Sequence, residues 1–319
     1  MNEPLITIGI TCYREGDWLR ECWESVLAQT DDRWAAVLVM DGENDERTRQ
    51  VFERIEHSKL RKHAMEENVG PYPTRNKAFE LTETPYHFYL DGDDQLVPDS
   101  VRLVLRTFEE NPAAGIVYGD YQYFGGASRI ARFPRTVSAD DFIAGQPTPG
   151  ACAYRRETWE RVGCFAPELA RGNADYDFLI GAIESGISSR HCGEVFYRYR
   201  VGNSGTVSTS YRLRYHETLE IMVRRHPRFF HDRRRRRAFL ACGYARAATE
   251  NLKAGDRETA CALASKAMRL GKWRDAEAWR VLLYSRLPAW ATRGLRAVWR
   301  EARNETPMGG KADRGEPER

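Results

Sequence analysis

The sequence has no paired cysteines, no long apolar run and no strong excess of one charge. Its seven cysteines are scattered, odd in number and without a CxxC pair, which argues against a disulfide framework and a zinc site and fits a reducing cytoplasm. No apolar run approaches the roughly 20 residues that a membrane span needs, and no signal peptide is visible before the first predicted strand. These absences predict a cytoplasmic protein that is soluble or at most peripheral at a membrane.

The charge balance excludes a general attraction to polyanions. The net charge is +3 at pH 7, so we expect no nucleic-acid partner. The charge is uneven, because the acidic clusters fall in the first third and the region after Arg198 is rich in arginine. With 319 residues, of which 42% are hydrophobic, the chain can form one large domain or one domain plus an appendage.

Three carboxylates stand directly after one short apolar segment. Residues 86–90 show no polar alternation, which is typical of a strand covered on both faces. Asp91, Asp93 and Asp94 follow at its carboxyl end, where open α/β sheets bind their ligands. Carboxylates so close together repel one another, and a bound Mg²⁺ or Mn²⁺ would remove that cost. The stretch alone permits a second interpretation, in which a turn and helix-capping aspartates precede a helix that starts near Pro98.

Strand and helix patterns alternate along the first third of the chain. Two apolar runs, 5–11 and 34–40, each end in a polar turn that contains acids, and a helical pattern follows each of them. This alternation predicts an α/β fold with a doubly wound, mostly parallel sheet. Further strands are predicted at 114–121 and 151–154, and further helices at 156–162 and 173–185.

The later part of the chain is predicted to be irregular and then helical. Residues 125–150 are predicted to form a long surface excursion, and the Gly/Ser-rich segment from Arg198 a mobile lid. In the helical extension, residues 237–269 resemble one tetratricopeptide-like hairpin, which must pack on a neighbour. The predicted regions are an α/β domain, a C-terminal helical region and a disordered tail, over residues 1–212, 213–303 and 304–319.

Five turn segments, taken in order, resemble those of the family 2 glycosyltransferases of the GT-A fold over roughly residues 4–212. The similar segments are 10–15, 39–45, 68–78, 90–94 and 174–177. The resemblance implies an inverting transfer of a sugar from a nucleotide sugar, most simply a UDP-sugar, to a hydroxyl of a glycan or lipid-linked acceptor. It also implies Mg²⁺ or Mn²⁺ as cofactor and a role in the synthesis of cell-surface glycans or polysaccharides.

The resemblance assigns the nucleotide pocket to five residues. Thr11, Tyr13 and Glu15 would line it, in the turn after the first strand. Asp41 would accept a hydrogen bond from the N3–H of a uracil ring. Arg75 would reach the pyrophosphate. Tyr13 could instead be a packing residue. The turn around Arg75 could instead be a solvated basic turn without a ligand.

The resemblance assigns the reaction itself to three carboxylates. Asp93 and Asp91 would hold the metal, with Asp91 also in the nucleotide-binding set, and Asp175 would be the general base. Asp175 would equally suit the first turn of a helix, where the macrodipole favours acids. The family's late histidine ligand is missing here, so an arginine would hold the diphosphate instead; the candidates are Arg198, Arg200 and Arg212.

The sequence is compatible with two rival functions and with two roles for the C-terminal tail. A sugar nucleotidyltransferase would need a glycine-rich loop directly after the first strand, which this chain lacks. A non-catalytic nucleotide-sugar-binding scaffold is the other rival. In the helical region, Trp279, Trp290 and Trp299 lie among arginines, which predicts either peripheral contact with the inner face of an anionic membrane or docking onto the catalytic domain.

Overall fold

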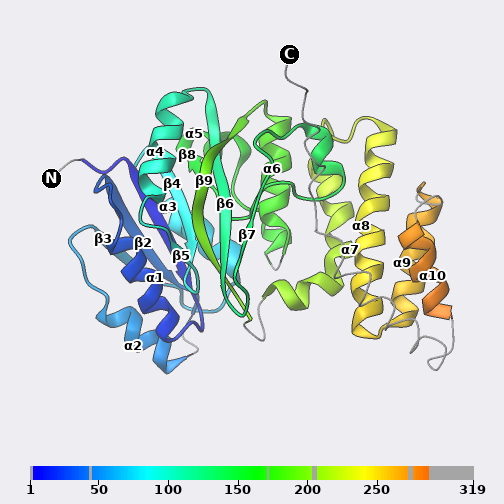
Figure 1. Ribbon diagram of the computed structural model, residues 1–319, viewed down its shortest axis with the longest axis horizontal. Coiled ribbons are helices and arrows are strands. Elements are labelled where there is room, and N and C mark those ends of the chain that lie inside the picture. The colour runs from blue at the N-terminus through cyan, green and yellow to red at the C-terminus, as the bar shows by residue number, and fades with distance from the viewer. Residues whose placement is uncertain (1–2, 43–44, 171, 203–206, 272–275, 287–319) are drawn as a thin grey trace, which may run out of the picture.

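The computed structural model describes residues 3–42, 45–170, 172–202, 207–271 and 276–286. One mixed sheet holds its strands, which are β1 (Ile6–Cys12), β2 (Trp34–Met40), β3 (Leu60–Ala64), β4 (Tyr86–Asp91), β5 (Gln95–Leu96), β6 (Ala114–Gly125), β7 (Arg129–Ala131), β8 (Ala153–Arg155) and β9 (Ser188–Val201). The strand order is β3-β2-β1-β4-β8-β6-β9-β5, with β7 paired to β6 (Figure 1).

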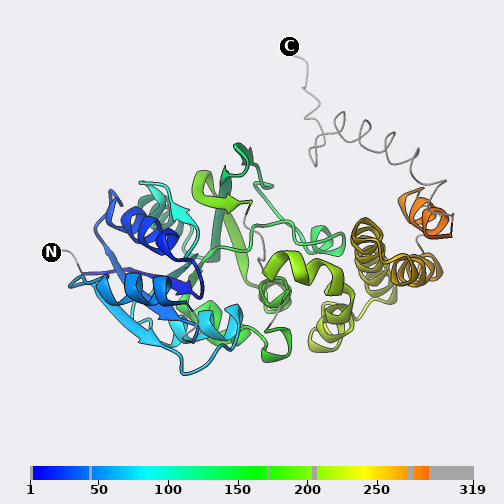
Figure 2. The same cartoon turned by 90° about the horizontal axis from the view of Figure 1, so that it is seen from below.

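Helices follow most of the strands and then continue alone. They are α1 (Asp17–Leu27), α2 (Glu46–Arg54), α3 (Pro71–Glu80), α4 (Ser100–Glu110), α5 (Arg156–Val162), α6 (Ala174–Glu184), α7 (Val207–Arg225), α8 (Arg233–Ala254), α9 (Arg257–Arg269) and α10 (Ala276–Arg286), with 3₁₀ turns η1 (Ala139–Ile143) and η2 (Pro167–Leu169). Helices α7 to α10 lie in a row at increasing distance from the sheet (Figure 2).

Strand direction confirms the predicted mostly parallel α/β sheet. β1 pairs in parallel with β2 and β4, and β2 with β3, while β6 pairs in parallel with β9. The short strands β5, β7 and β8 run antiparallel to their neighbours. The carboxyl ends of β1, β2 and β4 therefore meet at one edge of the sheet, which positions the candidate site.

Side-chain alternation explains why helices cover both faces of this sheet. On β2, Ala36 and Leu38 belong to the main buried core, whereas Val37 and Val39 pack with Ala78 of α3 in a second buried cluster. Successive residues of a strand point to opposite faces, so β2, which is covered on both faces, is apolar throughout. The polar residues are thereby displaced to the strand ends.

Four strands and one helix start differ from the prediction. The missed strands are β9, the short β5 and β7, and β3, an edge strand whose Arg61 and Lys62 are exposed. Helix α4 begins at Ser100 and not at Pro98, and the Pro98 carbonyl instead accepts a hydrogen bond from the N–H of Thr30, in the segment after α1.

The predicted lid from Arg198 is wrong for residues 198–201. These residues continue β9, where Arg198 pairs with Gln95 of β5; residues 203–206 lie outside the described part of the chain. The excursion at 125–150 is more ordered than predicted, because β6 extends to Gly125, β7 forms at Arg129–Ala131 and η1 packs on α8.

Helices α8 and α9 meet at the turn around Gly255 and Asp256. Gly255, in the left-handed conformation (φ 94°), ends α8, and the Asp256 side chain caps α9. Of the tail tryptophans, Trp279 on α10 is 52% exposed, and Trp290 and Trp299 lie outside the described residues. Within the described ranges, none of the helices combines the length and the apolar character of a membrane span.

Candidate functional site

The carboxyl ends of β1, β2 and β4 bring several predicted residues to one edge of the sheet. Thr11 lies opposite Asp91 in the parallel pairing of β1 with β4, and its hydroxyl contacts Asp91 Oδ1 at 3.5 Å. Asp41 directly follows β2. A glycine is required at 92, since a Cβ there would lie 2.9 Å from the Thr11 carbonyl oxygen. The turn that carries the acids therefore sits directly against β1.

The three clustered carboxylates have different surroundings. Asp94 is 1% exposed and accepts hydrogen bonds from the Tyr197 hydroxyl at 2.8 Å and the Arg200 N–H at 2.7 Å. Burial, with a further contribution from the negative charges of Asp93 and Asp91, raises the pKa of Asp94. Asp94 therefore ties β9 to the acidic turn, whereas Asp91 and Asp93 are partly exposed.

Arg75 is enclosed between two aromatic rings and one carboxylate. Its guanidinium carbon lies 5.0 Å from the ring centre of Tyr72 and 4.6 Å from that of Tyr89. Its Nη2 donates to both oxygens of Asp91, at 2.6 and 2.8 Å. The predicted nucleotide residues Arg75 and Asp91 therefore contact each other directly.

The turn after β1 holds a carboxyl group that titrates near neutral pH. Glu15 accepts a hydrogen bond from the Tyr13 N–H. Burial, followed by the charges of Asp93 and Asp91, raises the pKa of Glu15 to about 7, although the Tyr13 N–H opposes this shift. A protonated Glu15 adds no negative charge to the edge, which favours the approach of an anion.

Asp41 is a buried anchor for the loop that precedes α3. It is 4% exposed, and its carboxylate accepts from the Val69 N–H at 2.8 Å, the Gly70 N–H at 3.0 Å and the Asn68 side chain at 2.9 Å. Burial raises the pKa of Asp41. Its acceptor sites are thus largely used within the protein, a role that the sequence did not indicate.

Asp175 lies in the first turn of α6 and is partly exposed. Its Oδ1 accepts from the Tyr72 hydroxyl at 2.8 Å, and its Oδ2 from the Gln146 amide at 3.3 Å. A Cβ at Gly150 would lie 2.7 Å from Oδ2, so this position has no room for a side chain. A chain of contacts runs from Asp175 through Tyr72 and Arg75 to Asp91.

Two of the arginines predicted to bind the diphosphate, Arg198 and Arg200, lie on β9. Arg200 donates from Nη2 to Glu21 at 2.7 Å and from Nε to the Asp93 carbonyl at 2.7 Å. Arg198 bonds to Gln95 and lies over the Phe124 ring. The side chain of Arg212 lies outside the described residues.

A model of the family described as glycosyl transferase family 2 matches residues 7–166, about half of the chain. The chain belongs to this family. The match covers β1, β2 and β4 with the acidic turn, so the edge described above lies within the family's own region. The predicted family and enzyme class are confirmed.

Named relatives of this glycosyltransferase are distant. It is 24% identical over 215 residues to TuaG of Bacillus subtilis (strain 168), named for teichuronic acid biosynthesis, covering 66% of this chain and 84% of TuaG. It is 31% identical over 105 residues to a teichoic acid poly(glycerol phosphate) polymerase of Staphylococcus epidermidis, covering 32% of this chain and 15% of that protein. The chain therefore spans most of TuaG and a small part of the polymerase.

Solved structures share the fold of this glycosyltransferase. S. aureus TarS 1–349 in complex with UDP-GlcNAc superposes with a TM-score of 0.68 at 15% identity, over 93% of this chain and 92% of that one. The mannosyltransferase PcManGT from Pyrobaculum calidifontis, with GDP-Man and Mn²⁺, gives 0.53 at 16% identity over 94% and 89%. These likenesses confirm the GT-A type sheet with its C-terminal helices.

The acidic edge of this family 2 enzyme does not form a complete metal cage. No group of three His, Cys, Asp or Glu side chains is placed to hold a cation in the part of the chain that the structure describes. Asp91 is paired with Arg75, and Asp94 is buried. Mg²⁺ is commonly bound by one or two carboxylates together with substrate phosphates. Asp93 and Asp91 fit a cation bound in that way.

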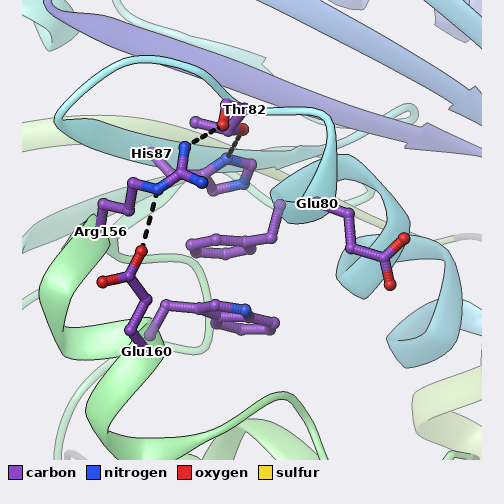
Figure 3. Close-up of a pocket in the computed structure, with 7 residues that line it drawn as sticks. Glu80, Thr82, His87, Arg156 and Glu160 are labelled. Atoms are coloured by element: carbon purple, nitrogen blue, oxygen red, sulfur yellow. Dashed lines mark hydrogen bonds and ion pairs between the residues drawn. The ribbon is translucent and has the colours of Figure 1, made fainter.

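A separate cavity of about 140 Å³ lies near the start of β4, at the opposite end of that strand from Asp91. Figure 3 shows His87 at the cavity between Thr82 and a stack of aromatic rings, formed by Phe79 and Trp159. The Thr82 hydroxyl donates to the Ala78 carbonyl, so it must accept from His87 Nδ1–H at 2.8 Å. Nε2 then carries no proton, and in the described structure it has no partner.

We expect acid to destabilise the fold through His87. Burial lowers the pKa of His87 to about 3, whereas the unfolded chain takes up this proton near pH 6.5. Between these pH values the unfolded chain binds a proton that the folded protein does not. The free energy of unfolding therefore decreases as pH falls from about 6.5 towards 3, by up to about 5 kcal/mol in total. Urea unfolding at pH 7 and pH 4.5, for the parent and His87→Gln, measures this loss. An equal loss in both proteins would contradict the assignment.

Proposed function

We propose that this protein is an inverting, metal-dependent glycosyltransferase that moves a sugar from a nucleotide sugar, most simply a UDP-sugar, to a hydroxyl of an acceptor. The observation that carries the proposal is the contact chain Asp175–Tyr72–Arg75–Asp91. It joins a partly exposed carboxylate that can take a proton to carboxylates that suit a phosphate-bound cation. Acceptor chemistry and leaving-group chemistry thus have adjacent sites.

The donor site lies at the ends of β1 and β2. The TarS complexes with UDP-GlcNAc and UDP, and the PcManGT complex with GDP-Man, support a nucleotide-sugar donor. In our proposal Thr11, Tyr13 and Glu15 line the nucleotide pocket. Asp41 shapes that pocket through the loop at 68–70, because its oxygens are engaged there, and a hydrogen bond to a uracil N3–H would share one of them.

Arg75 supports the diphosphate end of this site. Its Nε is buried and has no hydrogen-bond acceptor among the described residues. A buried donor without a partner is costly, and an anionic oxygen would satisfy it. We propose that Arg75 contributes to the binding of the pyrophosphate while it holds Asp91 in place.

The leaving group requires charge compensation. Asp93 and Asp91 would hold Mg²⁺ or Mn²⁺, which supplies positive charge next to the departing diphosphate when it is bound. The Mn²⁺ in the PcManGT complex supports this cofactor class. With its pKa raised to about 7, Glu15 is partly protonated near neutral pH, which limits the negative charge that this cation and the protein's own arginines must offset.

Asp175 takes the acceptor's proton in this mechanism. The acceptor oxygen forms a bond to the anomeric carbon as its proton passes to the carboxylate. The bond between the anomeric carbon and the diphosphate oxygen breaks, and its electron pair leaves with the nucleoside diphosphate. Attack from the face opposite the leaving group inverts the sugar's configuration. A general base of this kind typically contributes on the order of 10²–10⁴-fold to the rate.

The relatives' names support a glycan or lipid-linked acceptor in wall or surface polymer synthesis. TuaG is named for teichuronic acid, and others for teichoic acid and chondroitin. We place the reaction in the cytoplasm, with peripheral contact of the C-terminal region at the inner face of the membrane. Co-sedimentation with anionic liposomes tests that contact, for the full chain and for a chain that ends before Trp279.

A thermal-shift screen of nucleoside diphosphates and nucleotide sugars, with and without Mn²⁺, tests the proposed function. A ligand that binds the native state raises the melting temperature by mass action. We expect UDP and one UDP-sugar to give the largest shifts, and only with Mn²⁺ present. Shifts with sugar 1-phosphates and nucleoside triphosphates alone would instead support a nucleotidyltransferase.

Asp93→Asn is expected to weaken Mn²⁺-dependent UDP binding by at least about tenfold. The neutral amide no longer offsets the cation, and even the loss of outer-shell partners costs roughly 10–100-fold in metal affinity. Calorimetric titration of UDP with and without Mn²⁺ measures the change. Asp140→Asn, an exposed carboxylate on η1 that pairs with Arg235, is the matched control. Unchanged affinity in Asp93→Asn would remove Asp93 from the metal site.

A further inference from the structure

Two side chains from separate parts of the chain hold the two carboxylate oxygens of Asp175. The hydroxyl of Tyr72, at the start of α3, donates to Oδ1 at 2.8 Å. The amide of Gln146, between η1 and β8, donates to Oδ2 at 3.3 Å. Within the described ranges, these are the side chains that donate to this carboxylate. The two oxygens are therefore held from different sides.

The two hydrogen bonds differ in strength and in rigidity. Tyr72 is 8% exposed, and its ring packs edge-to-face on Phe165 at 5.4 Å and against the Arg75 guanidinium. Its hydroxyl is therefore fixed in place. Gln146 is partly exposed on an irregular segment, and its 3.3 Å bond lies beyond the usual N–H···O range. Oδ1 is thus held firmly, and Oδ2 loosely.

We infer that Tyr72 is a positioning residue that fixes Oδ1 of Asp175, and that Gln146 determines acceptor specificity at Oδ2. The inference rests on the proposed function, in which Asp175 is the general base. With Oδ1 bonded to Tyr72, the acceptor hydroxyl gives its proton to Oδ2. The acceptor oxygen bonds to the anomeric carbon, and the diphosphate leaves with the electron pair of the broken bond.

Asp175 is partly exposed, and its Oδ2 faces Gly150 as well as Gln146. A Cβ at position 150 would come within 2.7 Å of Oδ2, so any residue other than glycine would obstruct this oxygen from that side. When an acceptor hydroxyl reaches Oδ2, it replaces the long bond from Gln146 and releases an amide with donor and acceptor groups beside the acceptor. A polar group that must find a partner discriminates strongly between molecules that offer one and molecules that do not. Gln146 thereby selects acceptors with a second polar group near the reacting hydroxyl.

Tyr72→Phe tests the positioning role, with Tyr89→Phe as the matched control. Both variants keep the ring and lose a hydroxyl, and both rings lie on the Arg75 guanidinium, but only Tyr72 bonds to Asp175. Turnover is measured as UDP release from a panel of UDP-sugars, with water as acceptor and then with a panel of saccharides. UDP affinity is measured by calorimetry with Mn²⁺.

We expect Tyr72→Phe to lower kcat by about 10–100-fold, since small misplacements of reacting groups cost up to about 10²-fold. Its UDP affinity and acceptor KM should stay within about twofold of the parent, and Tyr89→Phe should stay within about threefold in kcat. A kcat in Tyr72→Phe equal to that of Tyr89→Phe would overturn the positioning role. A loss confined to UDP affinity would overturn it as well.

Gln146→Ala tests the specificity role, with the exposed Gln122→Ala on β6 as its control. We expect the acceptor KM to rise about tenfold and the order of preferred acceptors to change. An unchanged acceptor order and KM would overturn this role. Asp175→Asn distinguishes a failure of this inference from a failure of the proposed function. If that variant keeps full turnover, or if the parent turns over no UDP-sugar, the proposed function is wrong, and this inference is wrong with it.

Discussion

Asp175→Asn is expected to lower turnover by about 10²–10⁴-fold, the usual cost of losing a general base. The amide is isosteric: its oxygen can still accept from the Tyr72 hydroxyl, its NH2 can donate to the Gln146 amide oxygen once that amide turns, and the donor edge around Asp91 is untouched. UDP affinity with Mn²⁺ should therefore equal that of the parent. Initial rates of UDP release and calorimetric UDP titration measure the two quantities separately.

The outcome of this substitution decides between mechanisms. Turnover close to that of the parent would exclude Asp175 as the base and would favour a retaining mechanism or another carboxylate. Asp177 is a poor substitute, because it is 2% exposed and bonded to α7. A loss of UDP affinity instead of turnover would mean that Asp175 belongs to the donor site.

Asp177→Ala is expected to lower the free energy of unfolding by about 3–5 kcal/mol, the typical cost of breaking a buried charged pair. Asp177 accepts from Arg225 Nε at 3.0 Å and from His226 Nε2 at 2.9 Å. These bonds join α6, which carries Asp175, to the end of α7. The alanine leaves His226, which is 5% exposed, with one fewer acceptor. Chemical denaturation at pH 7 measures the loss.

A double-mutant cycle with His226→Gln separates this pair from the rest of the packing. We expect a coupling energy within the roughly 0.5–3 kcal/mol found for residues in contact. Additive losses would show that the Asp177–His226 hydrogen bond is not what joins the two helices.

We further propose that the catalytic unit extends through α7, because Leu219 and Met222 of this helix lie in the main buried core. A chain that ends at 212 should then fail to fold.

The order of elements and the acidic edge followed from local patterns. Apolar runs of the right length and acid-bearing turns predicted β1, β2 and β4 and placed Asp41, Asp91 and Asp93 at strand ends. Strand β9 was missed, although aromatic residues and arginines alternate at 197–200, because the Gly/Ser-rich residues that follow outweighed this signal. Edge strand β3 has exposed Arg61 and Lys62 and little apolar signal.

The partners of the predicted residues could not be found in the same way. The bonds from Tyr72 to Asp175 and from His226 to Asp177 join positions 103 and 49 residues apart in the chain. Tyr72 lies within the predicted loop segment 68–78, where the sequence favours a packing role for it. Gln146 stands among prolines and glycines and has no periodicity to mark it. Such pairings depend on tertiary geometry, which local propensity does not encode.

The bare backbone at Gly150 limits how this enzyme can diverge. A methyl group there would push on Asp175 Oδ2 at 2.7 Å and on the Tyr89 hydroxyl at 3.2 Å. Substitutions should therefore be tolerated at the exposed residues 128–130, where a new side chain meets solvent. At position 150 even alanine would move the carboxylate. New acceptor preferences are thus expected to arise by exchange of neighbouring residues such as Gln146, around one position that stays glycine.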